Sequence, residues 1–382
     1  MKDIKVKEAF RKEYGDEFRF FAAPGRINII GEHTDYNNGL VLPAAIDKRM
    51  YLAIRPRSDN KVLISSVDFE QTVAFKVNHP AHDLPHWAKY PYGVIKELQV
   101  DGHQIKGFEA AFGGDIPTGA GLSSSAALEC TFALALNSIF NLGIDKLTLA
   151  KIGQRAEHNH AGVKCGIMDQ FASLHGQQGH VIKLDCGSLK HELFLLELKG
   201  FEFFLTDTRV KHSLATSEYN SRRYKCQEGV MLLRSKMPWV RSLRDVRPKD
   251  VELYKAILGQ EIFLRCVYVT EENQRVEETC KALQQGQIEH VGKLMYQSHH
   301  GLQHKYMVSC HELDLLVDTA RNTSGVLGSR MMGGGFGGCT ITLIKSEAIQ
   351  NYKEKAKAAF AEKFGKEPVF YQVNISHGAC EL

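Results

Sequence analysis

The sequence predicts a two-domain protein of the α+β class, and three observations lead to this expectation. The chain has 382 residues, more than one hydrophobic core usually serves. Segments that alternate apolar and polar residues, typical of strands, occur between segments with helical periodicity. No Pro- or Ser-rich linker separates the two expected domains, so they should share an intimate interface. We expect one domain over residues 1–195 and a second over residues 196–382.

The composition is typical of a soluble globular protein, with 43% hydrophobic and 24% charged residues. The formal net charge is only +4 and basic residues are mixed with acidic ones, which argues against a nucleic-acid partner. No uncharged apolar run approaches about 18 residues, so neither a signal peptide nor a membrane span is expected. The nine cysteines are dispersed without a CxxC motif, as in reduced cytoplasmic proteins. We therefore expect a cytoplasmic protein.

Helices and strands are expected to alternate in the first half of the chain. Residues 1–18 are predicted to form a charged amphipathic helix. The further expected elements are a short strand over residues 19–23 that ends at Pro24-Gly25, strands within residues 47–80, a helix over residues 93–98 and a strand over residues 108–112.

The most informative stretch reads PTGAGLSSSAAL, over residues 117–128. Gly119 and Gly121 lack a Cβ, so the backbone can adopt left-handed angles and approach a ligand closely. Helical spacing begins at Ser123 or Ser124. The first amides of a helix have no partner within it and carry partial positive charge, which suits a phosphate group. The stretch predicts a nucleotide triphosphate site, although structural turns and caps often have this composition.

Two better-known phosphate motifs do not match. The stretch lacks the GK[ST] ending of a Walker A loop, which occurs nowhere in the chain, and the last glycine of the dinucleotide fingerprint. Gly333, Gly335 and Gly338 have GxGxxG spacing, but they precede an apolar strand instead of joining a strand to a helix. These glycines should bring the backbone close to a ligand or to the other domain.

A polar block follows the first strand. Arg26, Glu32, His33 and Asp35 lie within ten residues, beside Gly31. Charged groups on a loop between apolar strands can be aimed into a polar site by a rigid scaffold. Carboxylates and an imidazole can also hold the hydroxyl groups of a sugar. The alternative is a solvated turn with local ion pairs.

Two later segments carry further candidates. Glu157, on a predicted helix over residues 146–162, could hold Mg²⁺ beside a triphosphate. His158 and His160 lack a third ligand at zinc spacing, so a structural zinc is not expected. Asp169 suits either a catalytic base or a buried structural aspartate, and the sequence leaves both open.

Three separated blocks resemble the galactokinases of the GHMP small-molecule kinase superfamily. GRINIIGEHTDY, over residues 25–36, resembles the galactokinase signature. PTGAGLSSSAA resembles the phosphate loop of the superfamily, and GGGFGG, over residues 333–338, resembles its C-terminal motif. The resemblance implies an N-terminal domain like the second domain of ribosomal protein S5, a ferredoxin-like C-terminal domain and a site in the cleft between them.

The resemblance also implies an activity. The γ-phosphoryl group of ATP would be transferred to the C1 hydroxyl of α-D-galactose, giving galactose 1-phosphate and ADP in galactose catabolism. The implied requirements are ATP, Mg²⁺ and galactose, and we expect a monomer without a nucleic-acid or membrane partner.

Roles for individual residues follow from the same resemblance. Asp169 would be the base that takes the proton of the C1 hydroxyl, with Arg26 as its cationic neighbour. The implied sugar contacts are Glu32, His33, Thr34, Asp35, Gly166 and Tyr219. The implied ATP contacts are Ser66, an aromatic residue near Trp87, and the turn of Gly119, Ala120, Gly121, Leu122, Ser123, Ser124 and Ser125. The implied Mg²⁺ ligands are Ser125 and Glu157.

Two alternatives remain open. A kinase for N-acetylgalactosamine or L-arabinose would use the same chemistry, and the pocket volume near C2 and C5 of the sugar would distinguish it. A non-catalytic sensor of galactose and ATP would bind the same ligands. Galactokinase-like sensors lose small residues just after the serines, whereas Ser125, Ala126 and Ala127 are present here, which favours an enzyme.

Overall fold

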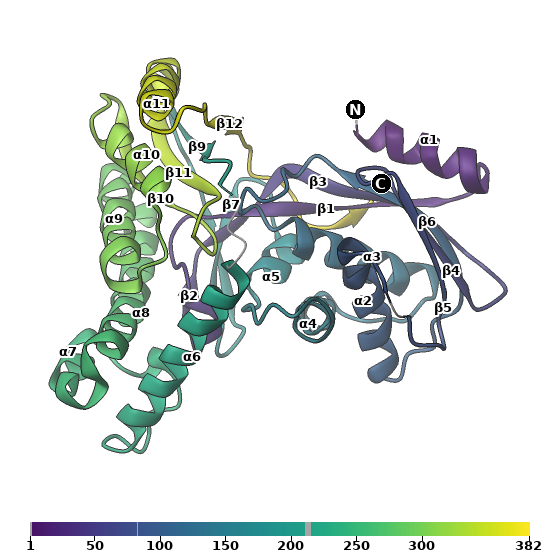
Figure 1. Ribbon diagram of the computed structural model, residues 1–382, viewed down its shortest axis with the longest axis horizontal. Helices are drawn as coiled ribbons and strands as arrows, with labels where there is room; N and C mark the ends of the chain where they lie inside the picture. The colour runs from purple at the N-terminus through teal and green to yellow at the C-terminus, as the bar shows by residue number, and fades with distance from the viewer. Residues whose placement is uncertain (1, 82, 211–214) are drawn as a thin grey trace.

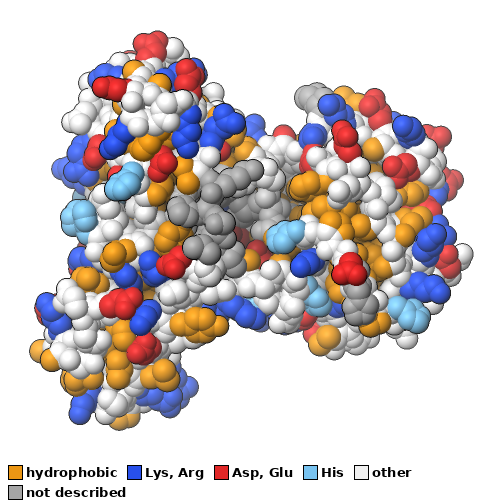
Figure 2. Space-filling model, viewed as in Figure 1, with side chains coloured by type: hydrophobic (Ala, Val, Ile, Leu, Met, Phe, Trp, Pro, Cys, Tyr) orange, Lys and Arg blue, Asp and Glu red, His pale blue; other side chains and the backbone are white. Residues whose placement is uncertain are grey.

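The chain forms two lobes, each organised by its own β-sheet (Figure 1). The structure, a computed structural model, describes residues 2–81, 83–210 and 215–382, without the side chains of residues 215 and 216. The surface is hollowed between the lobes (Figure 2). In the described part of the chain, no helix combines the length and the apolar character needed to cross a membrane.

A six-stranded sheet organises the first lobe, in the order β13-β1-β3-β6-β4-β5. Its strands are β1 (Arg19–Asn28), β3 (Pro43–Pro56), β4 (Lys61–Ser66), β5 (Gln71–Lys76), β6 (Phe108–Gly114) and β13 (Cys380–Glu381). Its helices are α1 (Lys2–Tyr14), α2 (Lys89–Val100), α3 (Ser124–Ile139), α4 (Lys146–Ala156) and α5 (Met168–His175). Neighbouring strands are antiparallel except β4 and β6, which are parallel.

Both faces of this sheet are covered, because successive side chains of a strand point to opposite faces. Phe20 of β1 packs with Phe10 of α1 on one face. Phe21 belongs to the main core on the other face, where Phe112 of β6 contacts Phe132 of α3 with ring centroids 6.0 Å apart. Figure 1 shows α1 on the side of the sheet opposite to α3 and α5. The near-continuous apolar character of β1 follows from burial on both faces.

Strand β1 is longer than the sequence predicted, and the expected end at Pro24-Gly25 was wrong. The pairing of β1 with β3 shifts register between Pro24 and Arg26, so a bulge accommodates the proline and the strand continues to Asn28. Gly25 is needed there, since a Cβ would lie 2.6 Å from the carbonyl oxygen of Leu122. Arg26 therefore lies on a strand and not on the predicted loop.

Helix α2 also begins earlier than predicted, at Lys89 instead of residue 93. A 3₁₀ turn over His86–Ala88 precedes it and buries Trp87, which is 6% exposed. The predicted helix over residues 146–162 consists of α4 followed by a π-helix over Glu157–Ala161. A π-helical turn of this kind is frequent at functional sites.

A four-stranded antiparallel sheet organises the second lobe, in the order β10-β11-β9-β12. Its strands are β9 (Phe201–Asp207), β10 (Val326–Met331), β11 (Cys339–Lys345) and β12 (Val369–Gln372). Helices α10 (His311–Arg321) and α11 (Ile349–Phe364) contribute to a hydrophobic cluster with this sheet. If all the helices between β9 and β10 are counted as one crossover, the order of elements is that of a ferredoxin-like fold.

A layer of helices connects β9 to β10. It consists of α6 (Ala215–Arg234), α7 (Pro248–Leu253), α8 (Lys255–Gln284), α9 (Ile288–Gly301) and a π-helix (Leu302–Tyr306). Helix α8 is interrupted at Gly259, whose φ of 70° is left-handed and suits a residue without a Cβ.

The main hydrophobic core extends across both lobes. A small sheet of β2 (Leu40–Val41), β7 (His180–Asp185) and β8 (His191–Leu195) completes the first lobe. The largest cluster of buried apolar side chains contains Ile29 of the first lobe together with Val276 and Ile341 of the second. Strand β13 pairs with β1, so the last residues join the first lobe's sheet. The division between residues 195 and 196 stays a prediction.

Candidate active site

A polar pocket of about 230 Å³ lies where β1 and α5 face the glycine-rich segment before β11. It brings together residues that are far apart in the sequence. Its lining consists of Arg26, Glu32, His33, Asp35, Glu157, Val163, Cys165, Met168, Asp169, Tyr219, Gly333, Gly334, Gly335 and Phe336. Seven residues predicted for catalysis, sugar binding or metal binding are in this set.

Arg26 and Asp169 form a two-pronged ion pair at one wall of the pocket. Nε and Nη2 of Arg26 donate to the two carboxylate oxygens at 2.7 and 2.9 Å. The third nitrogen, Nη1, donates to the carbonyl oxygen of Gly121 at 2.5 Å. Burial alone would lower the pKa of Arg26, but the negative charges of Asp169 and Glu32 raise it above its usual value. The guanidinium is therefore a fixed positive charge between the pocket and the glycine-serine turn.

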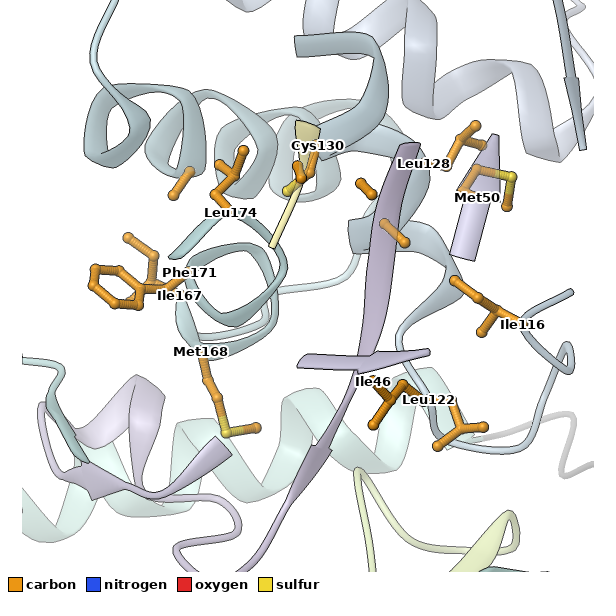
Figure 3. Close-up of a cluster of buried hydrophobic side chains, with 14 of the residues drawn as sticks. Ile46, Met50, Ile116, Leu122, Leu128, Cys130, Ile167, Met168, Phe171 and Leu174 are labelled. Atoms are coloured by element: carbon orange, nitrogen blue, oxygen red, sulfur yellow. The ribbon is translucent and has the colours of Figure 1, made fainter. Parts of the chain in front are cut away.

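Helix α5 holds Asp169 in its first turn, at the edge of the hydrophobic core. Ile167, Phe171 and Leu174 lie in the same cluster of buried side chains as Cys130 of α3 (Figure 3). The Asp169 side chain is 25% exposed, whereas the Arg26 side chain is only 5% exposed. The carboxylate is thus held by a buried cation and still reaches the pocket.

Ser123 connects the glycine-serine turn to Asp169. Its hydroxyl donates to Oδ2 of Asp169 at 2.5 Å. Ser123 has a left-handed φ of 60° and does not cap α3 with its side chain. The prediction that α3 begins at Ser123 or Ser124 is confirmed, since its first residue is Ser124. The first amides of α3 thus gain no side-chain cap from Ser123, which leaves them suited to an anion.

The glycine-serine turn and the glycine-rich segment of the second lobe approach each other through their backbones. Gly119 and Gly121 have left-handed φ values of 80° and 74°, as predicted. A Cβ on Gly333 would lie 3.4 Å from the Gly121 carbonyl oxygen, and one on Gly338 would lie 3.6 Å from that of Ala120. The side chains of Ala120 and Leu122 are buried, so this turn presents backbone to its surroundings.

Ser125 and Glu157, the two residues predicted to bind Mg²⁺, are adjacent in the structure. The Ser125 hydroxyl donates to Oε1 of Glu157 at 3.1 Å. Burial, then the negative charge of Asp169, raises the pKa of Glu157 to about 7. Within the described residues, no group of three or more His, Cys, Asp or Glu side chains could hold a metal ion. An ion here would take its other oxygens from phosphates and water, as Mg²⁺ commonly does.

Glu32 is fixed by groups from the second lobe. Its Oε1 accepts hydrogen bonds from Nη1 and Nη2 of Arg330, both at 3.2 Å, and from the amide of Gly333 at 2.9 Å. Oε2 of Glu32 makes no hydrogen bond to a described residue. One carboxylate oxygen thus anchors the side chain, and the other remains for a ligand in the pocket.

Sequence reasoning missed Arg330, which is fully buried. Besides Glu32, its guanidinium donates to the carbonyl oxygens of Asn28, Ile29 and Met331. It therefore ties the end of β1 to β10 across the two lobes. A charged residue inside an apolar strand beside the glycine-rich motif was the only available signal in the sequence.

His33 is a neutral hydrogen-bonding group in this site. Its Nδ1 and the Tyr36 hydroxyl are 2.7 Å apart, and Tyr36 is in turn 2.8 Å from the hydroxyl of Tyr306. Burial, then the positive charge of Arg222, lowers the pKa of His33 to about 3. Nε2 of His33 is buried without a hydrogen-bond partner among the described residues, so it could bind a ligand hydroxyl.

Tyr219, from the first turns of α6, forms part of the same wall. Its ring centroid is 5.3 Å from that of His33 and 5.4 Å from that of Tyr36. A Cβ on Gly334 would lie 3.3 Å from the Tyr219 ring. The tyrosine thus closes the pocket against the glycine-rich segment.

Two predicted sugar contacts have structural positions outside the pocket lining. Thr34 is fully buried, and its hydroxyl lies within hydrogen-bond distance of the carbonyl oxygens of Gly31 and Leu40, at 2.8 and 2.6 Å. Gly166 packs on Asp35, since a Cβ there would lie 2.0 Å from Oδ2 of that carboxylate. Thr34 stabilises the turn, and Gly166 leaves room for Asp35. Neither environment is visible in the sequence.

The residues expected near adenine also lie outside this pocket. Ser66, at the end of β4, is 3% exposed, and its hydroxyl accepts a hydrogen bond from the amide of Phe69 at 3.3 Å. The Trp87 ring contacts Phe112 at a centroid distance of 5.3 Å, and its Nε1 donates to Gln71 at 3.0 Å. Core packing, the commoner role of such aromatics, accounts for Trp87.

Comparison with known proteins agrees with this geometry. The family model of the galactokinase galactose-binding signature matches residues 8–56. The models of the GHMP kinases N terminal domain and of the GHMP kinases C terminal match residues 89–177 and 279–362. A mevalonate kinase structure from Methanococcus jannaschii, only 16% identical, superposes with a TM-score of 0.64 over 94% of this chain and 99% of that one. The fold is thus that of the GHMP kinases.

Closer relatives define the family within this class. A galactokinase of Clostridium beijerinckii is 40% identical over 100% of both chains. A galactokinase of Bacillus subtilis is 38% identical over 99% of this chain and 98% of the other. The crystal structure of Lactococcus lactis galactokinase complexed with galactose is 35% identical and superposes with a TM-score of 0.95 over 98% of each chain. The chain belongs to the galactokinase family.

Proposed function

We propose that the protein transfers the γ-phosphoryl group of ATP to the C1 hydroxyl of α-D-galactose. The observation that carries this proposal is the contact network of Arg26, which bonds Asp169 at the pocket and the Gly121 carbonyl at the glycine-serine turn. Phosphoryl transfer depends mainly on positioning and electrostatic stabilisation, so the sugar and nucleotide sites must share a fixed cation. Membership of the galactokinase family supports the choice of substrates.

In the proposed reaction, the bond between the β-γ bridging oxygen and the γ-phosphorus breaks and a bond from the C1 oxygen to that phosphorus forms. ADP takes the bridging oxygen, and Asp169 accepts the C1 hydroxyl proton. Carboxylates are much weaker bases than the anion of a sugar hydroxyl, so the proton transfers late, when the oxygen is already bonding to phosphorus. Arg26 stabilises the negative charge that develops on the transferring group.

The sugar would lie against the polar wall of the pocket. We propose that Glu32, His33, Asp35 and Tyr219 contact its hydroxyl groups. Glu32 and His33 each have one polar atom without a partner among the described residues, Oε2 and Nε2. Polar atoms whose side chains are held in place by their neighbours can discriminate one hydroxyl arrangement from another.

ATP would bind with its phosphates at the backbone of residues 119–125 and the first turn of α3. We propose that Ser125 and Glu157 hold Mg²⁺, which would neutralise phosphate charge when bound. Their oxygens are 3.1 Å apart, which fits ligands of one ion. The adenine contact, expected at Ser66 and near Trp87, remains a prediction.

The protein is also proposed to act as a monomer in the cytoplasm. Residues of a single chain complete the pocket, so no partner subunit is required. All nine cysteines are unpaired, which suits a reducing compartment.

The test is a panel of free sugars in an assay that couples ADP release to a spectroscopic signal. We expect galactose to stimulate ADP release far more than N-acetylgalactosamine or L-arabinose. Galactose binding without ADP release from any sugar would instead indicate a sensor. Stronger stimulation by one of the other two sugars would assign the protein to that substrate.

A further inference from the structure

A second pocket, of about 430 Å³, lies among the helices of the second lobe. Helices α8 and α9, the π-helix after α9 and the end of α10 surround it. Its lining includes Glu271, Arg275, Tyr296, Lys305 and Arg321. None of these residues lines the candidate active site, and the proposed reaction uses none of them.

The lining carries an excess of positive charge. Arg275, Lys305 and Arg321 share the lining with one carboxylate, Glu271, and Arg275 is also paired with Glu272 at 2.6 Å, so three cations are opposed by two carboxylates. The Lys305 ammonium group already donates to both oxygens of the Glu271 carboxylate, at 2.6 and 2.7 Å. Arg321 forms no ion pair with a described residue, and its guanidinium lies 4.6 Å from the centre of the Tyr296 ring. A concave site with this balance attracts anions.

Two buried polar atoms of this lining lack hydrogen-bond partners among the described residues. They are Nη2 of Arg275 and the hydroxyl oxygen of Tyr296. Arg275 is only 9% exposed, so Nη2 has little access to bulk water. A buried guanidinium N–H without an acceptor is costly, and buried polar groups in proteins are nearly always hydrogen-bonded. An anion bound at Nη2 of Arg275 would supply the missing acceptor.

Arg275 is connected to the turn that carries the sugar-site residues. Its Nε donates to Oε2 of Glu272 at 2.6 Å, and Oε1 of the same carboxylate accepts from the amide of Gly31 at 2.9 Å. The guanidinium also lies 5.7 Å from the centre of the Tyr268 ring, and the Tyr268 hydroxyl donates to the Glu32 carbonyl oxygen at 3.0 Å. Glu272 and Tyr268, which both hydrogen-bond the Gly31–Glu32 backbone, are therefore both in contact with the Arg275 guanidinium.

We propose that this second pocket binds a phosphate group, free or carried by a small metabolite, and that the bound group strengthens sugar binding. A tetrahedral dianion matches the planar N–H donors of Arg275 and Arg321. An oxygen bound to Nη2 holds the guanidinium in the orientation in which Nε bonds Glu272. The Gly31–Glu32 turn is then held more firmly in the conformation that faces the sugar. The effect on sugar binding rests on the proposed function.

Binding is tested by calorimetric titration of the full-length protein with inorganic phosphate, without sugar or nucleotide. We expect saturable binding that weakens at least about tenfold in Arg321→Gln, because one of the charged donors is lost. Tyr296→Phe should weaken it less. Arg241→Gln, which removes an exposed arginine outside this pocket, is the matched control and should leave it unchanged.

The glycine-serine turn is the other place where phosphate could bind, and Ser124→Asp separates the two. This substitution puts a negative charge at the start of α3 and should not affect the second pocket. Loss of phosphate binding in Ser124→Asp, with normal binding in Arg321→Gln, would place the ion at the turn and overturn the proposal. Absence of saturable binding in the unmodified protein would also overturn it.

Coupling is measured as the affinity for galactose with and without saturating phosphate. We expect about fivefold tighter galactose binding with phosphate, within the usual range of such couplings, and no change in Arg321→Gln. Equal galactose affinity in both conditions, with phosphate bound, would refute the coupling. Phosphate binding in a protein that binds no galactose would contradict the proposed function and leave the phosphate site intact.

Discussion

The hydroxyl of Ser123 donates a 2.5 Å hydrogen bond to Oδ2 of Asp169, so the glycine-serine turn is bonded directly to the proposed base. Arg26 bonds the same carboxylate and the carbonyl of Gly121 in that turn. Asp169 therefore has little freedom to rotate relative to the nucleotide site. Positioning of this kind contributes substantially to phosphoryl transfer, in which the protein does little covalent chemistry.

Ser123→Ala removes the hydrogen bond and leaves the backbone of the turn in place. We expect kcat to fall about 10- to 100-fold with a small change in the KM for ATP, because the loss affects the orientation of Asp169. Ser235→Ala, which removes an exposed hydroxyl outside the pocket, is the control and should leave kcat unchanged. An unchanged kcat in Ser123→Ala would show that Arg26 alone positions the carboxylate.

Asp169→Asn keeps the shape of the side chain but replaces one acceptor oxygen by an NH₂ donor and removes the charge and the basicity. Turnover should fall by roughly 10²- to 10⁴-fold, as for loss of a general base. ATP binding, measured by calorimetry, should be retained because Asp169 is not among the proposed phosphate contacts. A variant with near-normal kcat would exclude the proposed role of Asp169 as a base.

The metal requirement should depend on pH through Glu157. Its pKa of about 7 means that the carboxylate is charged above this pH and mostly protonated below it. The concentration of Mg²⁺ needed for half-maximal activity should therefore rise as the pH is lowered from 8 to 6. Glu157→Gln should need more Mg²⁺ at every pH and lose most of this dependence. Identical metal titrations for both proteins would point to another ligand.

Gly166→Ala tests the position of Asp35. The new methyl group would overlap Oδ2 of Asp35, at 2.0 Å, and the backbone of Gly166 needs no left-handed angle, so the effect is steric. We expect the KM for galactose to rise at least about tenfold, with little change in the KM for ATP. Gly113→Ala, in β6, is the control, because its backbone also needs no left-handed angle and a Cβ there would lie 3.2 Å from its nearest neighbours. Equal increases in both KM values would indicate general distortion instead.

The free energy of unfolding should decrease with rising pH because Glu129 stays protonated in the folded protein. It is fully buried, and burial followed by the negative charge of Glu157 raises its pKa well above 4.5. Above about pH 4.5 the unfolded chain releases this proton and the folded protein retains it, so the free energy of unfolding falls with increasing pH. Glu129→Gln should flatten this decline between pH 5 and 8 in urea-unfolding experiments. If the free energy of unfolding of Glu129→Gln fell with pH as steeply as that of the unmodified protein, Glu129 would not be the cause of the decline.

Several features of this protein follow from its sequence alone, because they depend on local backbone chemistry. The start of α3 is predictable from helical spacing after a turn that needs residues without a Cβ, and Gly119 and Gly121 do have left-handed angles. The approach of the Gly333–Gly338 segment to the other lobe is predictable because glycines before a buried strand allow close backbone contact. The polar block at residues 26–35 indicates a ligand site by its composition.

Only the tertiary structure decided which of these residues face the pocket. Arg330 bonds Glu32 from 298 positions away, and such a pair leaves no local pattern in a single sequence. Thr34 and Gly166 lie among the predicted sugar contacts, but packing directs one to backbone carbonyls and uses the other as space for Asp35. Residue types set which bonds are possible, and long-range packing selects the bonds that form.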